Sequence, residues 1–97
     1  MKILPKPIAF EWDKGNIDKN FIKHKVTNQE IEEIFNSKLL KTFEDIKHSQ
    51  KEIRFVALGI TNKKRRLYIS FTIRNQKIRI ISARDQSKKE RSLYEKK

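Results

Sequence analysis

A histidine in a polar segment and several arginines in β-rich stretches are the side chains of this sequence that could act on a phosphodiester. Histidine exchanges protons near neutral pH, so His48 is the candidate general acid or base. The planar fork of arginine matches two phosphate oxygens, which favours Arg54 and Arg79 as phosphate ligands. Glu52, two residues before Arg54, either orients that arginine or serves as the base. We therefore predict a catalytic set of His48, Glu52, Arg54 and Arg79.

Such a set suits RNA, because the substrate carries its own nucleophile, the 2′-hydroxyl. The protein has to align the backbone, remove the hydroxyl proton and stabilise the charge that builds up on phosphorus. One well-placed donor contributes roughly 3–4 kcal/mol to a transition state of this kind. We therefore expect no metal and no cofactor.

Five further residues are predicted to bind RNA. Tyr68 could stack on a base, and Arg74 and Arg84 could bind phosphates. Lys88 and Lys89 either steer RNA towards the protein or dock an acidic partner segment.

Each of the arginines and Glu52 also has a structural alternative. Arg54 and Arg74 could form surface ion pairs instead of binding phosphate, and Glu52 could simply pair with an arginine. Arg79 could be a solvated surface residue, and Arg84 could pair within the fold. The sequence leaves these alternatives open.

The net charge of +12 is concentrated at one end of the sequence. Residues 1–62 hold eleven Lys or Arg against nine Asp or Glu, whereas residues 63–97 hold thirteen against three. A cationic field of this kind attracts polyanions. A solubilising surface is the alternative, but the one-sided distribution favours a nucleic acid.

Several classes of protein are excluded by composition. The sequence has no cysteine, which excludes disulfides, thiol nucleophiles and iron–sulfur centres. His24 and His48 are 24 residues apart with no metal-binding frame, and two glycines cannot build a phosphate-binding loop. No apolar run approaches a bilayer-spanning length, and the first residues do not resemble a signal peptide. We expect a cytoplasmic protein with no membrane partner.

The length predicts a single domain over residues 1–97, with an extended lead-in at residues 1–7. Residues 8–12 can form a first strand. Asp13 is a candidate N-cap for a helix to about Lys23, and the capping box of Thr27 and Glu30 begins a second helix that ends near Asn36.

From residue 38 the hydrophobic period changes to two, which predicts an antiparallel sheet. The expected strands are residues 40–43, 52–60, 65–74 and 77–84, with a polar loop at 44–51 and turns at 61–64 and 75–76. A second capping box, Ser87 with Glu90, begins a C-terminal helix that ends near Glu95.

The predicted fold class is α+β, in the order β-α-α-β-β-β-β-α, with two N-terminal helices and one C-terminal helix packed on the sheet. Alternation predicts that Leu67, Ile69 and Phe71 face the helices, while the opposite face stays open and carries Arg79. Strict alternation places Arg84 on the other side from Arg79.

The chain closely resembles the BrnT family. The residues that carry the resemblance span about residues 8–95 and are Phe10-Glu11-Trp12-Asp13, Asn20, Lys23-His24, Val26, Phe35, His48, Glu52, Arg54, Gly59, Arg74, Ile78 to Arg84, Glu90 and Tyr94. The family has glycine after the histidine where this chain has Lys25. If that position needs a left-handed backbone, the lysine costs ~1 kcal/mol.

The resemblance implies a RelE/ParE-like fold and the toxin of a type II toxin–antitoxin pair. Its implied activity is metal-independent RNA cleavage that arrests translation. The implied partner is a BrnA-like ribbon-helix-helix antitoxin in a heterotetramer that represses its own operator DNA. A non-catalytic nucleic-acid-binding or interaction subunit of a repressor complex is the alternative.

Overall fold

The four strands pair in sequence order, each antiparallel to the next, in the computed structural model, which describes residues 4–95. They are β1 (Lys41–Glu44), β2 (Phe55–Ile60), β3 (Arg66–Arg74) and β4 (Lys77–Asp85). The two-residue turn between β3 and β4 consists of Asn75 and Gln76, both with positive φ. This is the turn geometry whose twist matches paired antiparallel strands. The predicted meander and α+β class are confirmed.

Three α-helices and one short 3-10 helix complete the described part of the chain. They are α1 (Lys19–His24), α2 (Asn28–Phe35), η1 (Ile46–His48) and α3 (Lys88–Glu95). Both capping boxes are confirmed: Thr27 and Glu30 close the start of α2, and Ser87 and Glu90 close the start of α3. Within residues 4–95 no helix is long and apolar enough to cross a bilayer.

The first predicted strand is wrong, because within residues 4–95 the segment 8–12 forms a single parallel bridge, Phe10 with Ile78, and no strand. The backbone of Asp13 then accepts bonds from Asn16 and Ile17, which turns the chain away from the sheet. The helix expected to follow Asp13 at once begins at Lys19 instead. A turn at Asp13 therefore replaces the predicted start of the first helix.

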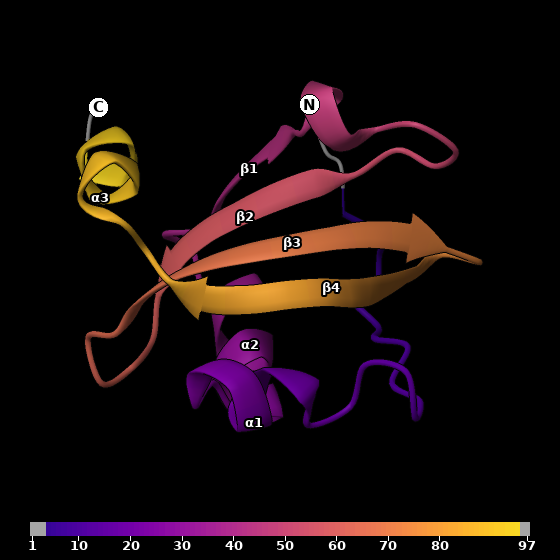
Figure 1. The fold of residues 1–97 in the computed structure, drawn as a ribbon, viewed down its shortest axis with the longest axis horizontal. Helices are drawn as coiled ribbons and strands as arrows, with labels where there is room; N and C mark the ends of the chain where they lie inside the picture. Colours follow the sequence, from indigo (N-terminus) through magenta and orange to yellow (C-terminus); the bar gives the residue numbers. More distant parts are fainter. Residues whose placement is uncertain (1–3, 96–97) are drawn as a thin grey trace.

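The core lies between one face of the sheet and the two N-terminal helices, which sit below β4 in the view of Figure 1. It contains residues from both layers: Val26, Ile31, Ile34, Phe35, Ala57, Leu67, Ile69, Phe71, Ile78, Ile80 and Ala83. Gly59 allows the close approach of α2 to β2, because a Cβ at that position would lie 2.6 Å from Ile34 Cγ2. Figure 1 shows α3 apart from α1 and α2, beyond the end of the strands.

A β-bulge corrects the predicted faces of β4. Ser70 pairs with Ser82 and Phe71 with Ile80, so Ile81 is an extra residue in β4. Because one extra residue reverses the alternation, Arg84 lies opposite Tyr68 and points away from the core, as Arg79 does opposite Thr72. The prediction that Arg84 and Arg79 lie on opposite sides is wrong.

The face away from the core is only partly open, in contrast to the prediction. The register places Lys41, Arg66 and Arg84 on this face, and all three bind α3, through the carbonyl of Tyr94, the carboxylate of Glu95 and that of Glu90 respectively. The C-terminal helix therefore covers one end of the face that the sequence predicted to be free of helices.

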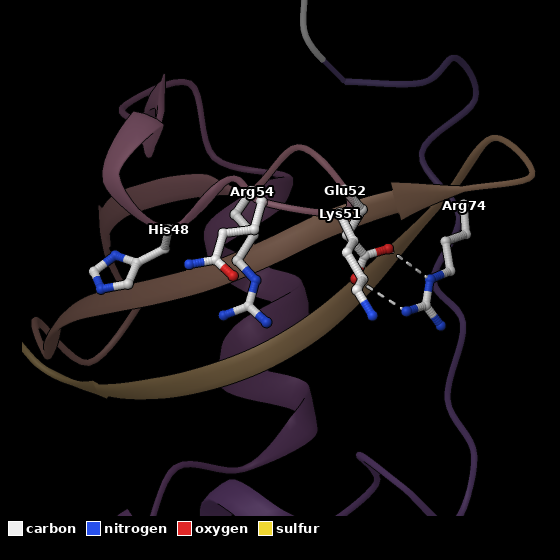
Figure 2. A pocket seen from close by; sticks show the side chains of 6 residues that line it. His48, Lys51, Glu52, Arg54 and Arg74 are labelled. Atoms are coloured by element: carbon white, nitrogen blue, oxygen red, sulfur yellow. Dashed lines mark hydrogen bonds and ion pairs between the residues drawn. The ribbon is translucent and has the colours of Figure 1, made fainter.

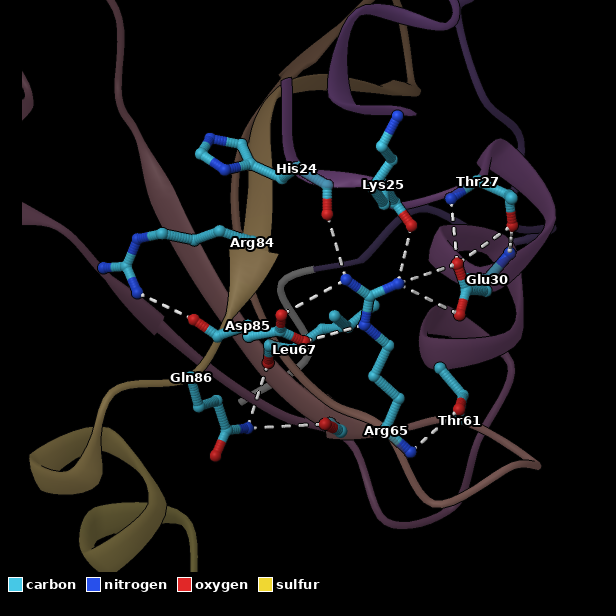
Figure 3. Close-up of polar contacts among 11 residues, drawn as sticks. His24, Lys25, Thr27, Glu30, Thr61, Arg65, Leu67, Arg84, Asp85 and Gln86 are labelled. Atoms are coloured by element: carbon cyan, nitrogen blue, oxygen red, sulfur yellow. Dashed lines mark hydrogen bonds and ion pairs between the residues drawn. The ribbon is translucent and has the colours of Figure 1, made fainter. Parts of the chain in front are cut away.

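Arg65 connects the two N-terminal helices to the sheet, as Figure 3 shows. Its guanidinium donates to the carbonyls of His24 and Lys25, at 3.0 and 2.7 Å, and forms ion pairs with Glu30 and Asp85. Lys25 sits in this connection with φ 59° and ψ 31°, the left-handed conformation. The condition under which the lysine is costly at this position is therefore met.

Candidate active site

A shallow groove of about 530 Å³ opens where the loop after η1 joins the start of β2 and the end of β3. Its lining is polar, with three cationic residues and one acidic residue: His48, Gln50, Lys51, Glu52, Arg54 and Arg74. Figure 2 shows Arg54 between His48 and the pair formed by Glu52 and Arg74. Three predicted site residues from one short segment, His48, Glu52 and Arg54, therefore meet the predicted Arg74 in one depression.

His48 lies at one end of the groove, on the last position of η1. Its Nδ1 is 2.8 Å from Oδ2 of Asp45, and its side chain is 60% exposed, whereas that of Asp45 is 16% exposed. The imidazole is therefore held at one nitrogen and open to solvent and substrate elsewhere. That arrangement suits a group that exchanges protons with a bound ligand.

Arg54 lies immediately before β2, and local hydrogen bonds fix its backbone. Its amide donates to Oγ of Ser49 at 2.9 Å, and its carbonyl accepts from the amide of Asp45 at 2.8 Å. Within residues 4–95 its guanidinium forms no ion pair with a carboxylate. Of the two arginines in the groove, Arg54 is therefore the one whose guanidinium can bind a phosphate through two N–H groups.

Glu52 and Arg74 neutralise each other at the other end of the groove. Two hydrogen bonds of 3.0 Å join the guanidinium to both carboxylate oxygens. These bonds lower the pKa of Glu52 and raise that of Arg74. Glu52 makes no hydrogen bond to Arg54, so the geometry matches the ion-pair alternative for Glu52 and Arg74.

Arg79 does not line the groove. Its side chain is 17% exposed and forms ion pairs with Glu11 at 2.9 Å and Asp13 at 2.7 Å. The hydrogen bond from Arg79 is the main cause that lowers the pKa of Asp13. The N-terminal segment thus covers the arginine that the sequence predicted to be open, and a phosphate would have to displace a carboxylate to reach it.

The guanidinium of Arg84 lies over the ring of Tyr68. The guanidinium carbon of Arg84 lies 4.1 Å from the centroid of the Tyr68 ring, and two bonds of 2.8 and 2.9 Å join Arg84 to Glu90. Burial is the main cause that raises the pKa of the Tyr68 hydroxyl. Lys88 and Lys89 are exposed on α3. None of these residues lines the groove.

Sequence reasoning missed Asp45, Gln50 and Lys51. The signal for Asp45 was its spacing, because residues three positions apart face each other across one helical turn. The sequence predicts a polar loop for this segment, and in an irregular loop such a spacing carries no information. Lys51 and Gln50 carried no local signal, and only the path of the chain into β2 brings them to the groove.

The sequence matches a family model described as the ribonuclease toxin BrnT of type II toxin–antitoxin systems, over residues 12–90. A search of curated proteins gave no match. The matched segment contains every residue of the groove, together with Arg79 and Asp13, and covers most of the 97 residues. The chain belongs to the BrnT family of ribonuclease toxins.

Proposed function

We propose that the chain is an endoribonuclease that cleaves RNA without a metal ion, in the groove between His48 and Arg74. The observation that carries this proposal is that one depression combines the solvent-open imidazole of His48 with the guanidinium of Arg54, which forms no ion pair within residues 4–95. General acid–base catalysis and charge stabilisation are the two requirements of this reaction.

In the proposed reaction the imidazole of His48 takes the proton of the 2′-hydroxyl. The 2′-oxygen then bonds to phosphorus while the bond from phosphorus to the 5′-oxygen breaks. The 5′-oxygen takes a proton from water, and the hydroxide so formed takes the proton held by His48. The products are a 2′,3′-cyclic phosphate and a 5′-hydroxyl. Arg54 binds the non-bridging oxygens, whose negative charge increases as the phosphorane forms.

Three other residues of the groove have supporting roles in this proposal. Lys51 adds positive charge beside Arg54. Glu52 holds Arg74 at the edge of the groove, where Arg74 binds a neighbouring phosphate through its remaining donors. Phosphate contacts of this kind set the register of the strand without reading its sequence.

The proposed partner is an antitoxin of the BrnA-like, ribbon-helix-helix kind, which would assemble with the toxin as a heterotetramer and bind operator DNA. The proposed target is cellular RNA in the bacterial cytoplasm, with arrest of translation as the result. The charge of +12 supports an acidic partner segment, because such a segment would neutralise the cationic surface and exclude RNA together.

Incubation of the purified chain with structured RNA and excess EDTA tests the proposal. We expect fragments ending in 2′,3′-cyclic phosphate and no cleavage of DNA of the same sequence. His48→Ala should lower the rate by about 10²–10⁴-fold, the usual contribution of a general acid or base. His24→Gln is the matched control, since His24 does not line the groove.

A non-catalytic subunit that only binds nucleic acid is the second candidate. The ion pairs of Arg79 with Glu11 and Asp13 favour it, because they hold within the fold an arginine that was predicted to be catalytic. Intact RNA after incubation with the wild-type chain, both alone and in a translating extract, would reject the first candidate in favour of the second.

A further inference from the structure

We propose that Asp45 is a positioning residue that fixes His48 with its proton on Nδ1 and its Nε2 free to accept the 2′-hydroxyl proton. This inference rests on the proposed ribonuclease function and names the group that makes His48 competent. The contact between Nδ1 of His48 and Oδ2 of Asp45, at 2.8 Å, is the observation from which it follows.

The chemistry of the pair determines the tautomer. A carboxylate has no proton to donate, so the nitrogen that contacts Asp45 has to be the N–H of the neutral ring. The other nitrogen, Nε2, then carries a lone pair. In a free imidazole the proton exchanges between both nitrogens, so the carboxylate selects the form that can act as a base through Nε2.

Asp45 is well placed for this role because its own position is fixed. Its side chain is 16% exposed, its amide donates to the carbonyl of Arg54 at 2.8 Å, and its carbonyl accepts from Oγ of Ser49 at 2.7 Å. Ser49 Oγ in turn accepts from the amide of Arg54. The same few bonds therefore hold the imidazole, through Asp45, and the phosphate-binding arginine in one frame.

The hydrogen bonds around Ser49 also distinguish the pair of His48 and Asp45 from an ordinary exposed ion pair within one helical turn. An exposed ion pair between residues three apart contributes little and is easily exchanged for water. Here one partner is mostly shielded and is bonded through its backbone to the residue that precedes β2. The charged groups that share the groove with the imidazole are Lys51, Glu52, Arg54 and Arg74, and none of them is hydrogen-bonded to it.

Nitrogen chemical shifts of the imidazoles, recorded by NMR on the uniformly ¹⁵N-labelled wild-type chain at alkaline pH, test the tautomer directly. His24→Gln assigns the two rings. We expect the Nδ1–H form for His48. The Nε2–H form in the wild-type chain would overturn the proposal, and this result does not depend on whether any Asp45 variant folds.

Turnover measurements on RNA provide the second test. Asp45→Asn should lower kcat by about 10- to 100-fold, less than the loss of His48 itself, while KM changes less than two-fold. The His48 signals should move towards the Nε2–H form. Glu44→Gln is the matched control, because it removes a carboxylate from the neighbouring exposed position without touching the imidazole.

The outcomes separate this inference from the proposed function. If His48→Ala cleaves RNA as well as the wild-type chain does, the assignment of His48 fails and with it the reason for Asp45. If His48→Ala is inactive but Asp45→Asn keeps full kcat or the wild-type tautomer, the function holds and the role of Asp45 is rejected.

Discussion

The guanidinium of Arg79 binds Asp13 through both terminal nitrogens, at 2.7 and 3.1 Å, and Glu11 through one of them at 2.9 Å. These carboxylates lie 66 and 68 residues before the arginine in the sequence. The pairs therefore attach the N-terminal segment to β4, next to the bridge between Phe10 and Ile78. An arginine that the sequence predicted to bind RNA thus connects two parts of the fold.

Replacement of Arg79 by alanine should lower the free energy of unfolding by about 1 kcal/mol, since three charge-assisted hydrogen bonds are lost and partly replaced by water, and the exposure of Asp13 limits the loss. Urea unfolding followed by tryptophan fluorescence measures this change near the affected segment, through Trp12. Arg74→Ala is the control, because its pair with Glu52 is exposed and should contribute little. Equal stability of the two variants would contradict the structural role of Arg79.

Replacement of Arg54 by alanine should affect activity and leave stability almost unchanged. The side chain forms no ion pair within residues 4–95, so unfolding should change little, whereas RNA cleavage should fall by roughly 10²–10³-fold, as for the loss of one oxyanion donor. Lys47→Ala removes a nearby exposed charge outside the groove and controls for general electrostatics. If both variants lose the same activity, the charge of Arg54 acts only by attraction of RNA.

Local signals in the sequence were sufficient for the elements that local contacts determine. The capping boxes of Thr27 and Ser87 and the turn at residues 75–76 appear as predicted, because their hydrogen bonds join residues at most three positions apart. The contact of His48 with Asp45 is equally local. Its spacing of three residues was present in the sequence, but the spacing predicts a contact only in a helix, and the polar composition of the segment predicted a loop.

Non-local features were not predictable in this way. The bulge in β4 depends on how Ser70 and Phe71 pair across the hairpin, and alternation alone gives no sign of it. It decides that Arg84 lies beside Tyr68, away from the core. The partners of Arg79 are also remote in sequence, so composition predicted a free cation where the fold contains an ion pair.

Replacement of Gly59 by alanine should destabilise the fold by about 1–3 kcal/mol, the usual cost of overpacking. A Cβ there would lie 2.6 Å from Cγ2 and 2.9 Å from Cδ1 of Ile34, whose side chain is fully buried. The double variant with Ile34→Ala should lose less than the sum of the two single losses, because the truncation makes room for the new methyl group. Additive losses in urea unfolding would show that Ile34 is not the obstacle.

Replacement of Lys25 by glycine should stabilise the chain by up to about 1 kcal/mol, because glycine adopts the left-handed conformation without the Cβ strain. The gain is offset in part by the lost contact of Lys25 with the ring of Phe21, 5.5 Å from the ammonium nitrogen. Lys23→Gly, in the regular part of α1, should instead destabilise. A lower melting temperature for Lys25→Gly would mean that the lysine contacts outweigh the strain.

The ion pair of Glu90 with Arg84 should make stability depend on pH in the acid range. Hydrogen bonds from Arg84 are the main cause that lowers the pKa of Glu90. A carboxyl group whose pKa is lower in the folded state stabilises the fold above its ordinary value, near 4.5, and that contribution disappears as the pH falls through the lower folded value. The free energy of unfolding should therefore hold its neutral-pH value down to about pH 4.5 and decline below it.

Glu90→Gln isolates this effect, because the amide oxygen can still accept from the backbone of Ser87 while the charge is gone. The variant should be less stable by about 1 kcal/mol at pH 7 and should lose less stability between pH 5 and pH 3, since charge-assisted bonds exceed neutral ones by about that amount. Glu95→Gln, with a side chain that is 56% exposed, should change neither quantity much. Parallel pH profiles for wild type and Glu90→Gln would mean that other carboxylates govern the acid transition, and that Arg84 is held beside Tyr68 by packing instead of charge.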